Sequence, residues 1–92
     1  MDARWEKLTL LLKNEEFPLP YTLKVIGNNS PAFQEGCLRL MHRFPQLKQT
    51  GSRSTSKSLK VSFTFEFTSA NAEEIIDVYQ AASTMTDILV LL

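Results

Sequence analysis

The segment LKVSFTFEF, from Leu59 to Phe67, constrains the fold of this chain more than any other part of the sequence. Its odd-numbered positions are all apolar, whereas its even-numbered positions are polar or charged. Successive side chains of a strand point to opposite faces, so the alternation predicts a strand with one buried and one solvent face. The predicted buried side chains are Leu59, Val61, Phe63, Phe65 and Phe67. The predicted exposed side chains are Lys60, Ser62, Thr64 and Glu66.

A second alternating strand is predicted from Tyr21 to Ile26, with Lys24 on its solvent face. Gly27 and Asn28 tolerate positive φ and can turn the chain out of this strand. The dipeptide Ser30-Pro31 supplies a good N-cap and a good first helical residue, so we expect a helix to begin there. The predicted apolar stripe of this helix is Phe33, Cys37, Leu40, Met41 and Phe44.

Three further segments complete the pattern. Leu47 to Thr55 is polar and contains Gly51, which indicates a weak edge strand. Asn71 and Glu74 form a capping-box pattern, which predicts the start of a second helix. The ending ILVLL, residues 88–92, shows no alternation, which predicts a last strand covered on both faces.

The predicted order is therefore strand, helix, strand, strand, helix, strand. With right-handed crossovers this order gives an α+β, ferredoxin-like βαββαβ sandwich, in which two helices cover one face of a four-stranded antiparallel sheet. Trp5, Leu8 and Leu12 have helical spacing and predict a short N-terminal helix. We expect an N-terminal extension over residues 1–15 and one ferredoxin-like domain over residues 16–92.

The composition excludes several classes of protein. The 92 residues contain one cysteine and one histidine, so an internal disulfide is impossible and a zinc site within the chain is not expected. No apolar run approaches the roughly 18 residues that span a bilayer, and the N-terminus lacks the features of a secretory signal. We expect a cytoplasmic protein without a metal, a cofactor or a membrane partner.

No catalytic constellation is found, and we predict that the protein is not an enzyme. Cys37 lies in the apolar stripe of the first long helix, where burial keeps a thiol unreactive. His42 stands alone near the end of that helix. Glu73, Glu74 and Asp77 indicate the first turn and the solvent face of the next helix rather than an acid–base pair.

The charges are unevenly distributed although the net charge is zero. Between Gly36 and Phe65 every charged residue is basic, and from Glu66 onward every charged residue is acidic. One explanation is that the basic end of the first helix pairs with the acidic surface of the second. The other is a basic binding surface, so our alternative function is nucleic-acid binding by the basic 48–60 hairpin. The predicted lack of aromatic residues on the uncovered sheet face argues against this alternative.

The last strand and Lys24 point to a partner. The side chains from Leu89 onward cannot all lie beneath the helices, so either the N-terminal segment with Trp5 or a second copy of the chain covers the remainder. We predict a homodimer interface that includes Trp5, Leu89 and Leu91. Lys24 points to the same uncovered face, where it is either an ordinary exposed lysine or a contact for a ligand or partner.

A family resemblance rests on Glu16-Phe17-Pro18, on Lys24-Val25-Ile26-Gly27, on Val61-Ser62-Phe63 and on the short apolar strand at the C-terminus. In these segments the chain resembles the YbeD-like family of small bacterial proteins, a family of unknown function that is sometimes labelled lipoate regulatory. The resemblance implies a fold akin to the regulatory ACT domains, which bind small effectors. The ligand-binding residues that it suggests are Phe17, Pro18, Lys24, Gly27, Asn28 and Asn29.

Taken together, the residues and the resemblance predict a non-enzymatic regulatory module. We expect it to bind a small effector or a protein partner and to act as a homodimer in the bacterial cytoplasm.

Overall fold

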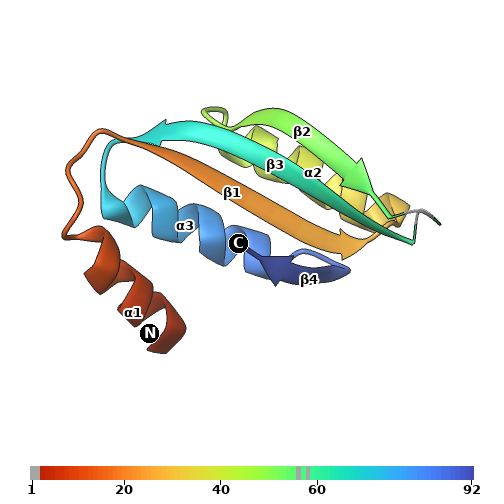
Figure 1. Cartoon of the computed structure of the whole chain (residues 1–92), viewed down its shortest axis with the longest axis horizontal. Helices are drawn as coiled ribbons and strands as arrows, with labels where there is room; N and C mark the ends of the chain where they lie inside the picture. Colours follow the sequence, from red (N-terminus) through yellow and green to blue (C-terminus); the bar gives the residue numbers. More distant parts are fainter. Residues whose placement is uncertain (1–2, 56, 58) are drawn as a thin grey trace.

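One four-stranded antiparallel sheet organises the chain in the computed structural model, which describes residues 3–55, 57 and 59–92. The elements are α1 (Ala3–Leu12), β1 (Leu19–Asn28), α2 (Pro31–Arg43), β2 (Lys48–Ser54), β3 (Lys60–Ser69), α3 (Ala72–Ser83) and β4 (Ile88–Leu91). The strands lie in the order β2-β3-β1-β4, and α2 and α3 cover one face (Figure 1). The predicted ferredoxin-like fold is confirmed, with α1 as the additional N-terminal helix.

The core lies between the sheet and the two helices α2 and α3. Its fully buried apolar side chains come from both layers: Leu23, Val25, Phe33, Phe65, Ile75 and Val78. Burying each such side chain contributes about 1.5–3 kcal/mol, so this interface is the main source of stability. The alternation of β1 and β3 is confirmed with one exception. Leu59 is 67% exposed because β3 begins only at Lys60, which leaves Leu59 outside the sheet.

Both predicted helix starts are present. The Ser30 hydroxyl oxygen accepts a hydrogen bond from the Phe33 N–H at 3.1 Å and caps α2. The Asn71 side chain accepts one from the Glu74 N–H at 2.9 Å and caps α3. The Glu74 carboxylate accepts from the N–H of Ala70, one residue before the cap, at 3.1 Å. The capping box is thus formed with a one-residue displacement, and each helix begins where its local sequence predicts.

Within one chain the last strand is not covered on both faces, so the predicted cover by the N-terminal segment is wrong and cover by a second copy stays a prediction. Trp5 of α1 packs against Tyr79 of α3, with ring centroids 6.4 Å apart. Helix α1 therefore lies beside α3 at the bottom of the molecule and does not cross the sheet (Figure 1). Val90 and Leu92 remain 43% and 62% exposed on the uncovered side. No helix in the described part of the chain is long and apolar enough to cross a bilayer.

The expected pairing between the basic end of α2 and the acidic surface of α3 is also absent among the described residues. Arg39 forms its ion pair with Glu35 of the same helix, at 2.8 Å. The Arg43 guanidinium lies over the ring of Phe44, 5.3 Å from its centroid. The two helices therefore lie on the same face without an ion pair between these charges.

Candidate functional site

The ligand-binding residues suggested by the family resemblance do not come together. Phe17 and Pro18 precede β1, whereas Gly27, Asn28 and Asn29 lie at its other end. A strand rises about 3.3 Å per residue, so the ten residues of β1 separate the two groups by about 30 Å. Lys24 lies between them. A single small molecule cannot contact both groups.

Gly27 has a packing role that the sequence did not reveal. A Cβ at this position would lie 2.5 Å from the Asp87 carbonyl oxygen and 2.5 Å from the Phe33 ring. The space beside Gly27 is therefore occupied by the protein itself and is not available to a ligand. The chain leaves β1 without using the positive φ that Gly27 and Asn28 tolerate, because neither residue has one. The positive φ belongs to Asp87, at 66°.

Asn29 and Ser30 build a strand-to-helix junction. The Asn29 N–H donates to the Leu59 carbonyl at 2.9 Å, and the Asn29 side-chain oxygen accepts from Gln34 at 2.8 Å. The Ser30 hydroxyl donates to the Asp87 carboxylate at 2.6 Å. A carboxylate beside a helix N-terminus complements the helix dipole. These residues therefore explain the local structure and do not form an anion site.

The candidate functional surface is instead the face of the sheet that α2 and α3 leave uncovered, hereafter the open face. Directly paired residues of antiparallel strands point to the same side. Lys24 pairs with Thr64 of β3, and its backbone bonds with Leu92 on the other side. By this register the charged and apolar side chains of the open face are Lys48, Arg53, Lys60, Glu66, Pro20, Lys24, Ile26, Val90 and Leu92.

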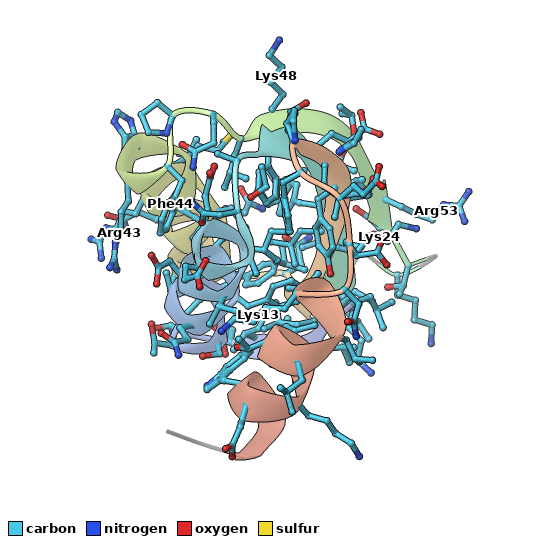
Figure 2. The ribbon with its side chains drawn as sticks, turned by 90° about the vertical axis from the view of Figure 1, so that its left-hand side faces the viewer. Lys13, Lys24, Arg43, Phe44, Lys48 and Arg53 are labelled. Carbon is cyan, nitrogen blue, oxygen red and sulfur yellow. The ribbon has the colours of Figure 1, made fainter. Side chains whose placement is uncertain are left out.

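A β-bulge brings Arg53 to the open face. Lys48 pairs with Glu66 and Arg53 pairs with Ser62, so both β2 residues share the side of these partners. Their separation of five positions places them on opposite sides of a regular strand. The irregularity between Gln49 and Gly51 adds one residue and reverses the alternation. Figure 2 shows Lys24 and Arg53 pointing to the same side, away from the helices, with Lys48 at the outer edge of β2.

The open face also has an apolar border and a hollow. Ile26 pairs with Val90 at the β4 side, next to the exposed Leu92. At the other end, a hollow of about 400 Å³ lies over Thr22 and Glu66. Its lining residues are Pro20, Tyr21, Thr22, Gln46, Lys48, Glu66, Phe67 and Thr68. The alternation of the sequence predicted that Lys24 and Glu66 are exposed. The residues of β2 and β4 that lie beside them could be identified only from the strand pairing in the structure.

The three predicted interface residues have different environments. Trp5 is buried against α3, and Leu91 is half-buried because it faces the core opposite Val25. Leu89 is 50% exposed, since it is the extra residue of a bulge between the pairs of Ile26 and Gly27. It borders an apolar groove of about 370 Å³ between α1, α3 and β4. Of the three, Leu89 is the one with a largely free side chain.

Two side chains with chemically reactive groups, Cys37 and Tyr79, are buried. Among the described residues no group of three His, Cys, Asp or Glu side chains can hold a metal ion. Burial raises the pKa of Cys37 to about 11, which disfavours the thiolate. Burial, and then a hydrogen bond with Tyr21, raises the pKa of the Tyr79 hydroxyl. That hydroxyl donates to the Leu92 carbonyl at 3.1 Å, which ties α3 to the last strand.

We expect Cys37 to react slowly with a thiol reagent in the native protein. A pKa rise from 9.0 to about 11 lowers the thiolate fraction at pH 8 about 100-fold. The Cys37 thiol ionises at a lower pH in the unfolded chain than in the native protein. The contribution of this thiol to the free energy of unfolding is therefore complete below pH 9 and is lost as the pH rises from 9 towards 11. Disulfide-exchange rates with and without urea measure the first effect. Urea titrations across this pH range, with Cys37→Ala as the control, measure the second. Equal rates in the native and unfolded chains would contradict both.

Comparison with known proteins identifies the family. Residues 13–92 match a family described as a protein of unknown function, DUF493. The chain belongs to the DUF493 family. YbeD belongs to the same family, so the resemblance seen in the sequence is confirmed at that level. No curated protein matches the chain.

Solved structures support the fold of this DUF493 protein. The solution structure of protein HP0495 from Helicobacter pylori has 16% sequence identity and a TM-score of 0.66, and the match covers 86% of each chain. Another solution structure of HP0495, described as a hypothetical protein, has 17% identity and a TM-score of 0.59. That match covers 83% of this chain and 87% of the other. At this level of identity the comparison shows a shared fold.

Proposed function

We propose that this DUF493 protein is a non-enzymatic regulatory module that binds a protein partner on the open face of its sheet. The observation that carries the proposal is the position of Lys24. It lies in the central part of the sheet, exposed, with Arg53 pointing to the same side and Val90 and Leu92 exposed beside it. A mixed charged and apolar surface of this kind is typical of a protein-binding site.

A protein partner fits the open face better than a small effector does. Small-molecule sites are concave and bury most of the ligand surface. The open face is one layer of strands, and the residues expected to hold an effector lie about 30 Å apart along β1. The resemblance to the YbeD-like family and to ACT domains supports a regulatory role.

We also propose that the protein works in the bacterial cytoplasm as a homodimer. A single free, buried cysteine suits a reducing compartment, and the matched solution structures come from a bacterium. The exposed Leu89 and the neighbouring apolar groove support self-association at the β4 edge. Trp5 and Leu91 contribute by shaping that edge from within.

Nucleic-acid binding by the 48–60 hairpin has weaker support. Lys48 and Lys60 lie at opposite ends of the paired β2 and β3 strands, and Ser56 and Ser58 of the hairpin lie outside the described residues. The aromatic residues of the described strands face the core, so they offer no platform on which bases stack.

Site-specific photo-crosslinking tests the proposal. A photoreactive amino acid replaces Thr64 in the centre of the open face or, as the control, the exposed Asp77 of α3. In the source cells we expect a discrete protein adduct from position 64 and none from position 77. Adducts of equal yield from both positions, or none from position 64, would overturn the assignment to the open face.

A thermal-shift panel and sedimentation supply the complementary measurements. A small ligand at a hundred times its Kd adds about 2.7 kcal/mol, which raises the midpoint by roughly 10 °C or more in so small a domain. We expect smaller shifts from amino acids, lipoate, octanoate and nucleotides. A large shift with any of them would replace the protein partner by a small effector. Sedimentation at the monomer mass would contradict the homodimer.

A further inference from the structure

The open face is basic although the protein is neutral. Four basic side chains lie on the open face or at its edge. The described residues of the four strands include only one carboxylate. The cations are Lys24, Lys48, Arg53 and Lys60. The carboxylate, Glu66, is paired across the strands with Lys48. Lys24, Arg53 and Lys60 therefore lack an acidic cross-strand partner, because their paired residues are Thr64, Ser62 and Asn28.

Exposed acidic residues lie on a helix that covers the other face of the sheet. Glu73 and Asp77 are exposed on α3, which covers the opposite face of the sheet. The strand residues of the open face therefore carry a net positive charge, which favours acidic partners. A second copy docked face to face would bring another surface of the same net charge against the first. The open face is therefore not complementary to itself.

Aliphatic side chains are interleaved with these cations. Val90 lies opposite Ile26, and Leu92 lies opposite Lys24, so the neighbouring side chains are about 5 Å apart across the strands. Ile26 and Arg53 both pair with Ser62, so they lie in one row across the sheet, two strands and about 10 Å apart. Lys24 lies two residues before Ile26 on β1, in the row of Leu92. A ligand that covers the face therefore meets Lys24 on a central strand, Arg53 at the β2 edge and aliphatic surface at the β4 edge.

We infer that the partner presents an acidic segment that also carries aliphatic side chains, with carboxylates on Lys24 and Arg53 and aliphatic groups on Val90 and Leu92. This inference rests on the proposed function and adds the chemistry of the partner to it. The charges set the orientation and the association rate, and burial of the aliphatic border supplies affinity. Nucleic acid satisfies the cations but leaves Val90 and Leu92 without an apolar contact and brings phosphates to Glu66.

Selection from a random peptide library displayed on phage tests the inference without knowledge of the natural partner. The bait is the full-length protein. We expect enriched peptides to combine Asp or Glu with Leu, Ile or Val, and to shift the amide resonances of Thr22, Lys24 and Thr64 in the ¹⁵N-labelled protein. We expect their binding to weaken at least tenfold between low and high salt, as exposed charge pairs are screened.

Two pairs of matched variants separate the charge from the apolar contribution. Lys24→Glu with Arg53→Glu is expected to weaken peptide binding at least tenfold. Lys7→Glu with Lys13→Glu reverses the same number of charges on and just after α1 and is expected to change binding less than twofold. Val90→Ser is expected to weaken peptide binding at least threefold. Leu11→Ser, at an exposed position of α1, is the control and is not expected to weaken peptide binding to this extent. Circular dichroism spectra establish that each variant is folded.

The outcomes distinguish the inference from the proposed function. Peptides that bind the open face without an acidic preference overturn the inference and leave the proposed function standing. The inference alone is also overturned if position 64 gives a discrete photo-adduct but the selection enriches no acidic peptide. If the experiments give no adduct and no selected peptide, both the inference and the proposed function are overturned. A fifteen-nucleotide single strand could instead bind more tightly than any peptide and lose this binding in the Lys24→Glu, Arg53→Glu variant. That result assigns the face to nucleic acid and overturns both the inference and the proposed function.

Discussion

Replacing Gly27 by alanine is expected to lower the free energy of unfolding by about 3 kcal/mol, at the upper end of the usual cost of overpacking. The added Cβ would lie 2.5 Å from both the Asp87 carbonyl oxygen and the Phe33 ring. The carbonyl oxygen is backbone and accepts the Asn28 N–H at 3.0 Å, so it cannot move without loss of that bond. The β1–β4 pairing at Gly27 and Ile88 would shift with it. Urea titration monitored by circular dichroism measures the loss.

The other described glycines provide the controls. A Cβ on Gly36 would lie 3.5 Å from the nearest Met85 atom, and one on Gly51 would lie 3.9 Å from Thr64, both ordinary contacts. Gly36→Ala, inside α2, is expected to stabilise the protein by roughly 0.5–1 kcal/mol, because alanine loses less backbone entropy on folding. If Gly27→Ala were as harmless as Gly51→Ala, the packing explanation for Gly27 would fail.

Truncation of Phe33 to alanine is expected to cost about 3–5 kcal/mol, a large part of the stability of a domain of this size. The side chain is 0% exposed, and its ring lies 5.9 Å from the ring of Phe63, so removal leaves a cavity between α2 and the sheet. The midpoint of thermal unfolding is expected to fall by roughly 4–8 °C per kcal/mol. Leu38→Ala, on the exposed side of the same helix, is the matched control and is expected to stay within about 0.5 kcal/mol of the wild type.

The two sites are expected to be coupled because they touch. In a Phe33→Leu background the smaller side chain relieves one of the two close contacts of a Cβ at position 27. Gly27→Ala is then expected to cost at least about 0.5 kcal/mol less than in the wild type, as measured in a double-mutant cycle. Additive costs would show that the Asp87 carbonyl alone restricts the position.

Local patterns were sufficient for the elements of the DUF493 fold. The alternation from Val61 to Phe67 and the caps at Ser30 and Asn71 depend on side chains within a few positions of one another along the chain. With the element order they predict the ferredoxin-like sheet. They also predict that Lys24 is exposed, since this depends on the parity of one strand.

The composition of the open face follows from contacts between distant segments. Arg53 reaches this face because a bulge in β2 reverses its alternation, and a bulge is defined by the pairing with β3. Val90 and Leu92 stay exposed because α1 packs on α3 instead of crossing the sheet. Gly27 is explained only by Phe33 and Asp87, whose atoms fill the space beside it. Such packing and pairing are long-range, so no single segment of the sequence specifies them.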